Sequence, residues 1–237
     1  MIQFYAPDIL ETLTLPESDS GHAIKVLRMQ AGDELQVIDG RGNCYTCRIA
    51  APDRKRTRVE IVESRPMPLP WPQQIVLAVA PTKHIDRMEW AVEKVTEIGV
   101  NRIIPVVADR SERRDLKVER LERIAVSAMK QSLKGVLPRI DPLTPVMDVI
   151  DGFKEYNRFI AYCDRSIPRL LLAREYQPEK NTIILIGPEG DFSPEEIRSA
   201  LDSSWKPVSL GPCRLRTETA AIVAVDTCHI IDQTVQS

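Results

Sequence analysis

The chain has 237 residues, of which 43% are hydrophobic and 28% are charged, and its formal net charge at pH 7 is −2. This is the composition of an ordinary globular protein, long enough for one large domain or two modest ones. The charge provides no global positive field for nucleic acid, so any RNA contact would depend on local basic clusters. The longest apolar stretches, such as residues 183–186 and 220–225, are far too short to cross a bilayer.

Cysteine content and the first residues bear on the cellular compartment. Five cysteines in a chain of this length do not make a disulfide framework. Residues 1–5 lack the basic start and the apolar run of a secretory signal. We therefore expect a protein of the reducing cytoplasm.

The first part of the chain is predicted to form mostly strands. A helix is expected over residues 20–29. Two strands, 34–38 and 45–49, flank the turn Asp39-Gly40-Arg41-Gly42-Asn43, whose residues tolerate positive φ, and a β-branched run at 58–62 is a further strand. This pattern predicts a small β-barrel of about 70 residues, the size of many accessory modules.

Cys44 and Cys47 have the spacing of metal ligands, but no second Cys or His pair lies nearby in the sequence to complete a tetrahedral site. Residues three apart on a strand also face opposite sides. We expect structural cysteines and no metal.

A proline occupies every second position in Arg65-Pro66-Met67-Pro68-Leu69-Pro70-Trp71-Pro72. Proline fixes φ and removes amide donors, so this segment favours a semi-rigid spacer and cannot form a helix or a central strand. We place a domain boundary here, with one domain over residues 1–70 and another over residues 71–237.

After the spacer, predicted strands alternate with predicted helices. Ile85, Met88, Val92 and Val95, for example, recur at helical spacing after an apolar run of strand length. Such alternation predicts an α/β fold with a parallel sheet covered by helices on both faces. The expected strands are 75–80, 102–107, 158–162, 182–186 and 207–210, and the expected further helices are 118–133, 168–176, 194–202 and 217–232.

Ligands of parallel α/β sheets bind beyond the carboxyl ends of the strands. A first glycine-bearing turn, residues 187–191, lies at such an end. Ser193 and Glu196 make a capping box and Pro194 suits the first helical position, so the next helix has a well-defined start. From the pattern alone, an ordinary connection and a ligand site are about equally supported.

A second glycine-bearing turn, residues 210–216, follows the last predicted strand. It contains Gly211, and a helix then starts at the threonine cap Thr217. A solvated helix entry and a ligand site are again about equally supported. The charged residues that cluster at this start are Arg214, Arg216 and Glu218.

Neither turn matches the Gly-x-x-x-x-Gly-Lys-Ser/Thr phosphate loop or the dinucleotide Gly-x-Gly-x-x-Gly pattern. The first turn instead has four carboxylates, which would repel a phosphate at the helix N-terminus. A neutral or partly cationic ligand fits better, and S-adenosylmethionine, with its sulfonium and ammonium, is one. The four acidic residues are Glu189, Asp191, Glu195 and Glu196.

Together the two turns resemble the C-terminal signature of the RsmE family, bacterial methyltransferases that modify uracil N3 in 16S ribosomal RNA. The matching residues are Gly187-Pro188-Glu189-Gly190 with Phe192-Ser193 and Glu196, and Leu210-Gly211 with Leu215-Arg216-Thr217-Glu218-Thr219-Ala220. Further segments agree in order along both expected domains. They are His22, Val26-Leu27-Arg28, Gly32-Asp33, Lys83, Asp86-Arg87-Met88-Glu89, Lys94, Glu97-Ile98-Gly99-Val100, Arg120, Ile124, Gln131-Ser132 and Leu137-Pro138.

The resemblance implies a SPOUT-type parallel α/β domain with a deep trefoil knot over residues 71–237, and a PUA-like RNA-binding β-barrel over residues 1–70. It implies S-adenosyl-L-methionine as cofactor, 16S rRNA or the small ribosomal subunit as substrate, and a homodimer. Nothing in the periodicity of the sequence would have suggested a knot. The chain departs from the family pattern at Cys213, where arginine is frequent, and at Lys134.

Mapped by position, three loops at 162–164, 186–190 and 209–217 are expected to hold the cofactor. The residues expected there are Tyr162, Ile186, Gly187, Pro188, Glu189, Gly190, Ser209, Leu210, Gly211, Leu215 and Thr217.

Uracil N3 is protonated at neutral pH, so the enzyme must remove that proton or stabilise the developing anion. Arg216 is the first candidate for charge stabilisation, because it lies beside the cofactor turn and is always cationic. Glu218 is expected to orient Arg216 or to act as a base, and orientation is favoured because an ordinary glutamate is a weak base at pH 7. The residues expected to contact RNA are Arg28, Arg54, Lys55, Arg56, Arg110, Arg113, Arg114 and Arg214.

Three other hypotheses remain open on the sequence. One is a SPOUT methyltransferase that acts on a different RNA base, and another is a non-catalytic RNA-binding protein of the same shape. The third, a nucleotide-dependent hydrolase, predicts ATP binding and a magnesium requirement, and the acidic first turn argues against it.

Overall fold

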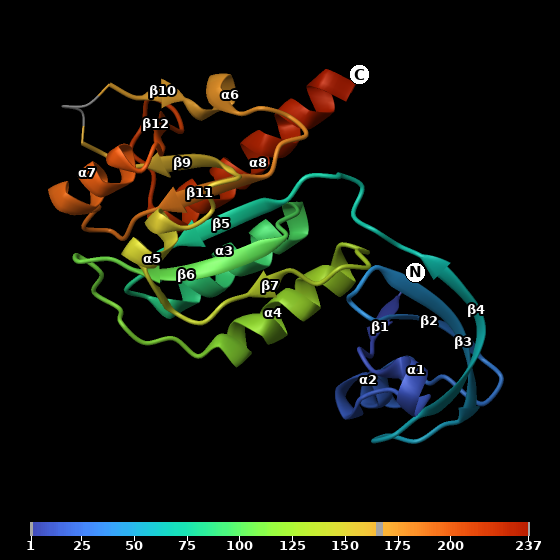
Figure 1. Ribbon diagram of the computed structural model, residues 1–237. Coiled ribbons are helices and arrows are strands. Elements are labelled where there is room, and N and C mark those ends of the chain that lie inside the picture. Colours follow the sequence, from blue (N-terminus) through green and yellow to red (C-terminus); the bar gives the residue numbers. More distant parts are fainter. Residues whose placement is uncertain (1, 165–167, 237) are drawn as a thin grey trace. The chain divides into compact units, whose positions relative to one another are not determined.

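The computed structural model describes residues 2–164 and 168–236. Its internal contacts divide the chain into two compact units (Figure 1). The first comprises Met1–Pro70 together with Val126–Leu137, and the second comprises Trp71–Ala125 together with Pro138–Ser237. The proline-rich segment thus lies where the first unit gives way to the second.

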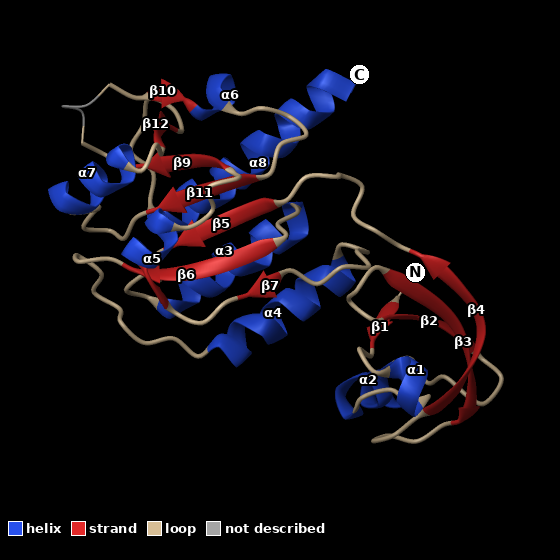
Figure 2. Ribbon diagram, in the orientation of Figure 1, coloured by secondary structure: helices blue, strands red, loops and turns tan. Residues whose placement is uncertain are grey.

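The first unit is built on a four-stranded sheet in the order β1-β2-β3-β4 (Figure 2). β1 pairs in parallel with β2, and the other two pairs are antiparallel. β4 is an edge strand, which explains how it can end in a proline that could not donate to a central ladder. The strands are β1 Gln3–Tyr5, β2 Glu34–Ile38, β3 Asn43–Ala51 and β4 Arg58–Pro66.

The helical part of this unit differs from the sequence prediction at both ends. After α1 (Ile9–Thr12), α2 (Glu17–Gly21) continues directly into a π-helix, η1 (His22–Val26). The helix expected over residues 20–29 is thus present, but it begins at Glu17, ends at Val26 and changes from α to π geometry at His22. Arg28 has a left-handed φ of 57°, a conformation that glycine usually supplies where a helix ends. Because no glycine stands there, this helix end could not be predicted from the sequence.

Cys44 and Cys47 are both fully buried, in different apolar clusters. Cys44 packs with Ile38 and Met129, whereas Cys47 lies in the larger core of the first unit. The two side chains are therefore packing residues. Within residues 2–164 and 168–236, no three His, Cys, Asp or Glu side chains are grouped so as to hold a metal ion.

The second unit holds a sheet in the order β10-β12-β9-β11-β5-β6-β7, with β8 also paired to β6. All of these pairs are parallel, so the predicted parallel α/β fold is confirmed. The central strands β5 and β11 are buried along their whole length, as expected for a sheet covered on both faces. The strands are β5 Ile75–Val79, β6 Arg102–Val107, β7 Arg139–Ile140, β8 Thr144–Pro145, β9 Asn157–Ala161, β10 Leu170–Leu171, β11 Thr182–Ile186 and β12 Lys206–Ser209.

Helices cover this sheet on both faces (Figure 1). α5 and α7 contact each other and share one apolar core with alternate side chains of β5, β6, β9 and β11. α3 and α8 pack together, and α8 contacts β5 and β11. No helix in the described part of the chain is both long and apolar enough to span a membrane. The helices are α3 Ile85–Ile98, α4 Val118–Gln131, α5 Val146–Asp151, α6 Leu172–Glu175, α7 Pro194–Asp202 and α8 Thr217–Gln236.

The helix expected over residues 168–176 is mostly wrong. Leu170 and Leu171 are extended and pair with β12, and only the four residues of α6 are helical. The two leucines extend the edge of the sheet, a long-range pairing that local periodicity does not reveal. The deep knot implied by the resemblance stays a prediction.

Candidate functional site

Three neighbouring strands of the second unit, in the order β12-β9-β11, end at the same edge of the sheet. In a parallel sheet this carboxyl edge is where ligands bind. The loops that follow these strands, with the first turn of α8, line a pocket of about 430 Å³. The lining residues are 161–164, Arg169, 186–188, Asp191, 208–215, Thr217 and Ala220.

A direct hydrogen bond joins the two glycine-bearing turns. The Thr217 hydroxyl, buried at the start of α8, donates to the Gly187 carbonyl at 3.0 Å. Gly187 also lies against the ring of Phe192, where a Cβ would come within 2.9 Å of the ring. The packing of the turn therefore requires glycine at this position, and the two turns belong to one site.

The second turn depends on Gly211, whose φ of 134° is rarely adopted by residues with a side chain. The Ser209 hydroxyl accepts from the Gly211 amide at 3.2 Å and donates to the Gly211 carbonyl at 2.9 Å. This pair of bonds fixes the backbone of the turn. Leu210 and Leu215 also line the pocket.

The pocket combines apolar walls with charges of both signs. The charged lining residues are Asp164, Arg169, Asp191 and Arg214. Tyr162 also lines the pocket, and among the described residues its buried hydroxyl has no hydrogen-bond partner. Burial raises the pKa of this phenol, and the charges of Asp164 and Asp191 raise it further while Arg169 opposes them. An unpartnered buried hydroxyl is costly, so a hydrogen-bond acceptor at this point would be stabilised.

The acidic residues of the first turn engage the backbone of other loops. Glu189 accepts from the Lys83 amide at 3.0 Å, and Asp191 accepts from the Cys163 amide at 2.9 Å. Of the four carboxylates of this turn, all within the described chain, only Asp191 lines the pocket. The turn thus presents one carboxylate to a ligand, and not the four expected from the sequence.

The predicted capping box at the start of α7 is confirmed. The Glu196 carboxylate accepts from the Ser193 amide at 2.7 Å and from the Asp109 amide at 2.8 Å. Glu196 is only 3% exposed. Its charge therefore joins α7 to the loop after β6, which makes it a structural residue.

The structure brings together most of the residues expected to hold the cofactor. The exceptions, Glu189 and Gly190, lie in the first turn but outside the lining, and the Gly190 carbonyl accepts from the Arg110 guanidinium at 3.3 Å. The expected residues that do line the pocket are Tyr162, Ile186, Gly187, Pro188, Ser209, Leu210, Gly211, Leu215 and Thr217.

Arg169 is a pocket residue that sequence reasoning missed. Its guanidinium donates to the Tyr162 carbonyl and lies over the Tyr162 ring, 5.6 Å from the centroid. Arg169 falls within the helix expected over residues 168–176, whereas in the structure it directly precedes β10. Its position shortly after the expected loop 162–164 was the only signal for it.

The two residues expected to do the chemistry differ in their surroundings. Arg216 is exposed and lies outside the pocket lining. Glu218 is 6% exposed, and one of its carboxylate oxygens lies 3.8 Å from Arg87 Nε. Its second oxygen is buried without a hydrogen-bond partner in the part of the chain that the structure describes. Arg87 of α3 is thus an ionic partner of Glu218.

The basic segment after β6 is tied to the neighbouring loops. Arg113 donates to the carbonyls of Thr82 and Lys83, at 3.2 and 3.1 Å. Arg110 and Arg114 also donate to backbone carbonyls. These three guanidiniums therefore help to hold the loops in place, and their remaining N–H groups are what they can offer to RNA.

The first unit carries a basic turn beside a cleft of about 490 Å³. Asp53 accepts from the amides of Lys55 and Arg56, each at 2.8 Å. The buried Ser20 hydroxyl accepts from the Thr57 amide at 2.9 Å, which fixes the turn against α2. The cleft is lined by Glu17, Ser18, Gly21, His22, Lys25, Val26, Arg54 and Lys55.

The remaining residues expected to contact RNA are exposed. Arg28 follows η1, and Arg56 lies in the basic turn of the first unit. Arg214 lines the pocket of the second unit. Lys25, which faces the cleft, was not singled out in the sequence, because only the folded chain brings η1 to the basic turn.

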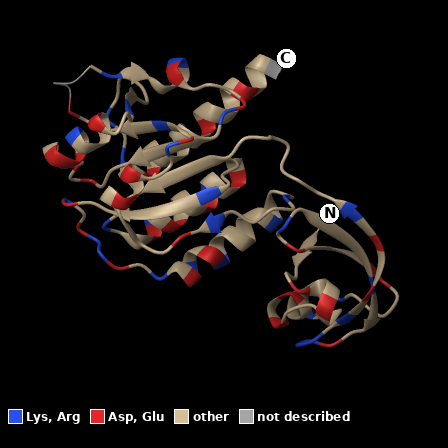
Figure 3. Ribbon diagram, viewed as in Figure 1, with Lys and Arg blue, Asp and Glu red and all other residues tan. Residues whose placement is uncertain are grey.

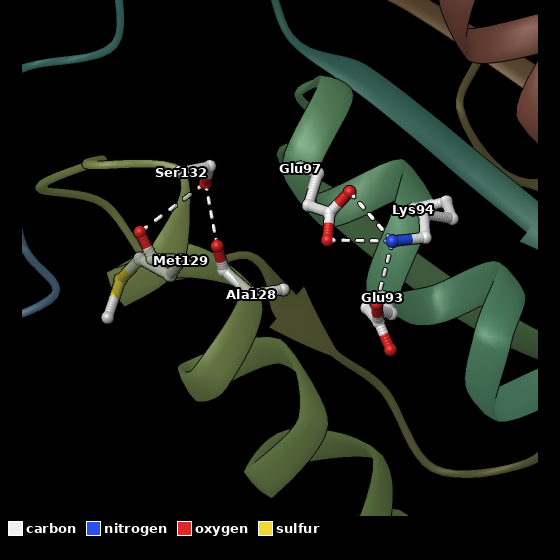
Figure 4. Close-up of polar contacts among 6 residues, drawn as sticks. All are labelled: Glu93, Lys94, Glu97, Ala128, Met129 and Ser132. Atoms are coloured by element: carbon white, nitrogen blue, oxygen red, sulfur yellow. Dashed lines mark hydrogen bonds and ion pairs between the residues drawn. The ribbon is translucent and has the colours of Figure 1, made fainter.

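Acidic and basic residues are interspersed along both units (Figure 3). On α3, Lys94 Nζ lies 2.7 Å from Glu93 and 2.9 Å from Glu97 (Figure 4). At the end of α4, the Ser132 hydroxyl donates to the Ala128 carbonyl at 2.7 Å (Figure 4). These parts of the family pattern stabilise helices and do not line the pocket.

Comparison with known proteins agrees with the fold. A family model described as an RNA methyltransferase domain matches residues 69–229, and one described as an RNA methyltransferase PUA domain matches residues 15–62. The second unit is thus of the RNA methyltransferase class. Ribosomal RNA small subunit methyltransferase E of Aquifex aeolicus is 31% identical over 219 residues, which cover 90% of this chain and 92% of the relative. The chain belongs to the ribosomal RNA small subunit methyltransferase E family.

Solved structures support the same assignment. A protein of Porphyromonas gingivalis described as a probable rRNA-methyltransferase is 46% identical, with a TM-score of 0.95 and coverage of 99% of this chain and 100% of the other. Ribosomal RNA small subunit methyltransferase E of Neisseria gonorrhoeae, bound to S-adenosyl methionine, is 27% identical, with a TM-score of 0.86 and 98% coverage of each chain.

Proposed function

We propose that this protein transfers a methyl group from S-adenosylmethionine to N3 of one specific uridine in 16S ribosomal RNA of the small subunit. The observation that carries the proposal is the pocket at the ends of β12, β9 and β11 in a chain of this family. The related Neisseria gonorrhoeae protein binds S-adenosyl methionine, which supports the choice of methyl donor.

The pocket residues fit this cofactor. S-adenosylmethionine carries an ammonium, a sulfonium, a carboxylate and an adenosine. Asp164 and Asp191 can pair with its cationic groups, Arg169 with its carboxylate, and Leu210 can pack against its adenine. The unpartnered Tyr162 hydroxyl offers a further hydrogen bond. The volume of about 430 Å³ lies within the range of roughly 300–1,000 Å³ for small-molecule pockets.

The methyl acceptor sets the chemical requirement. Bound S-adenosylmethionine supplies an electrophilic methyl group, whose displacement mostly needs positioning. The N3–H proton of uracil must pass to solvent for the new N3–CH3 bond to form, so negative charge develops on the base. We assign stabilisation of that charge to Arg216, which is permanently cationic and exposed directly before α8.

Glu218 is the second residue proposed for the chemistry. Arg87 lies beside one carboxylate oxygen, while the other is buried and unpartnered within the described chain. A buried acceptor without a donor is costly, so a substrate N–H at this point would be stabilised. We assign Glu218 a positioning role, because an ordinary glutamate is a weak base at neutral pH.

RNA recognition is assigned to local basic groups on each unit. In the first unit Lys25, Arg54 and Lys55 face the cleft, and in the second unit Arg214 lies at the pocket. The expected contacts of Arg28, Arg56 and the arginines after β6 are part of this proposal. Because such groups displace counterions from phosphates, log affinity for RNA should fall steeply with log salt.

Nucleoside mass spectrometry tests the proposal. Free 16S rRNA and small subunits, both from a strain that lacks this methyltransferase, are incubated with the protein and S-adenosylmethionine, and with the protein alone. We expect cofactor-dependent N3-methyluridine at one position. Methylation of another base would support the alternative SPOUT activity, and RNA binding without methylation would support a non-catalytic RNA-binding protein.

We also propose that the protein acts in the cytoplasm as a homodimer. Trp90 on α3 and Ile230 on α8 are exposed apolar side chains, at 46% and 53%, on two helices that pack together. These two side chains are the candidate contacts with a second copy of the chain. Light scattering should give twice the chain mass, and Trp90→Glu or Ile230→Glu should lower it. A monomeric wild-type protein would contradict the proposal.

A further inference from the structure

The five cysteines fall into two groups. Cys44, Cys47 and Cys228 are buried, whereas Cys163 and Cys213 are exposed. Both exposed cysteines line the pocket at the ends of β12, β9 and β11. Every solvent-accessible thiol of the protein therefore lies at the proposed cofactor site.

Backbone hydrogen bonds hold the loops that carry the two exposed cysteines. The Cys163 amide donates to the Asp191 carboxylate at 2.9 Å, which ties the loop after β9 to the loop after β11. Cys213 follows Gly211, whose backbone is held by the Ser209 hydroxyl. Both cysteines thus border one cavity of about 430 Å³ from different loops, which places a group attached to either residue at the cavity lining.

The buried cysteines provide an internal contrast in reactivity. Burial raises the pKa of Cys44, raises that of Cys47 to about 11, and also raises that of Cys228. A thiol must lose its proton to react, and a reagent must be able to reach it. The buried thiols meet neither condition at neutral pH, whereas the pocket pair is accessible.

We propose that Cys163 and Cys213 form a modification site for low-molecular-weight disulfides, and that modification of either closes the pocket to the cofactor. The cysteine sulfur attacks one sulfur of RSSR, so that a protein S–SR bond forms while the RS–SR bond breaks. The released RS⁻ takes up the proton that the cysteine loses. The attached R group then fills cofactor space, and excess reducing thiol reverses the step.

This inference rests on the proposed function for the identity of the cofactor. It makes methylation depend on the thiol redox state: the pocket is open under reducing conditions and closed when disulfides accumulate. Because the cofactor and the R group compete for one cavity, bound S-adenosylmethionine should protect both cysteines.

The first test uses the reduced full-length protein and glutathione disulfide, with and without saturating S-adenosylmethionine. Peptide mapping by mass spectrometry should find adducts at Cys163 and Cys213, no adduct at the three buried cysteines, and protection by the cofactor. Calorimetry on the modified protein should show S-adenosylmethionine affinity reduced by at least roughly tenfold, and dithiothreitol should restore it.

Cys163→Ser, Cys213→Ser and the double variant complete the test, each compared with its own untreated sample. The double variant should show no effect of the disulfide on cofactor affinity. Persistent sensitivity there, or unchanged affinity in a fully modified wild-type protein, would overturn the inference and leave the proposed function intact. An untreated wild-type protein that does not bind S-adenosylmethionine would overturn both.

Discussion

The Thr217 hydroxyl donates a 3.0 Å hydrogen bond to the carbonyl of Gly187, which lies 30 residues earlier in the chain. Both residues line the pocket. The bond fixes the first turn of α8 to the end of β11, so the position of the helix and the shape of the first turn depend on each other. A disturbance at either turn should therefore reach the ligand site through this contact.

Thr217→Val tests that coupling. The substitution keeps the shape of the side chain but leaves the Gly187 carbonyl without its donor, which costs about 1–3 kcal/mol when the group is buried. We expect a lower free energy of unfolding in urea and a several-fold weaker affinity for S-adenosylmethionine by calorimetry. Thr219→Val, in the same turn but outside the pocket lining, is the matched control. Wild-type cofactor affinity in Thr217→Val would show that the bond does not shape the site.

Arg216→Ala separates chemistry from cofactor binding. Arg216 is exposed and does not line the pocket, so its removal should leave S-adenosylmethionine affinity within a few-fold of wild type. Methylation of rRNA should be abolished, because the charge that develops on the base loses its cationic partner. Arg198→Ala, which removes an exposed arginine from α7, should retain turnover. Unchanged turnover in Arg216→Ala would refute the assigned role.

Lys25→Ala and Arg54→Ala test the cleft of the first unit. Each removes one cation from its lining, so each should weaken rRNA binding and lower the slope of log affinity against log salt by about one. Cofactor affinity should not change, since both residues belong to the first unit. Lys154→Ala, an exposed lysine of the second unit, is the control. Equal salt slopes in all of these variants would exclude the cleft as an RNA contact.

Short-range sequence patterns predicted the strand and the helix on either side of the first glycine-bearing turn. The strand at 182–186 and the helix at 194–202 have the predicted bounds, because an apolar run precedes a turn and the capping box of Ser193 and Glu196 marks the helix start. Both glycine-bearing turns could be placed at strand ends for the same reason. The residues that carry these signals are neighbours in the chain.

The features that sequence reasoning missed depend on contacts between distant segments. The extended Leu170 requires β12 beside it, and Arg169 reaches the pocket only because that pairing replaces the expected helix. Arg87 meets Glu218 only when α3 packs on α8. Likewise, Lys25 joins the basic turn only after α2 and η1 pack against it. Neither hydrophobic periodicity nor a capping residue predicts these long-range contacts, so they could be found only in the folded chain.

A buried carboxylate near the end of α8 should make stability depend on pH. Asp232 is 5% exposed and accepts hydrogen bonds from Tyr176, at 3.0 Å, and from Gln73. Burial raises the pKa of Asp232 above its ordinary 3.8, although these hydrogen bonds and the charge of His229 oppose the shift. A raised pKa means that the folded state binds the proton more tightly. The stabilisation is therefore full below the unfolded pKa and is lost as pH rises through the folded one.

Asp232→Asn removes the charge but keeps an oxygen that can accept from Tyr176. Relative to wild type, its free energy of unfolding should therefore increase as pH rises from 3.8 toward neutrality, as measured by urea unfolding at several pH values. Asp39→Asn is the contrast, because there burial is outweighed by hydrogen bonds from Asn43, Arg41 and Tyr45, which lower the pKa of Asp39. That variant should lose stability relative to wild type over the acidic range as pH rises. For each variant, the measured quantity is the difference in free energy of unfolding from wild type as a function of pH. If both differences changed in the same direction as pH rises, burial would not control the titration of Asp232.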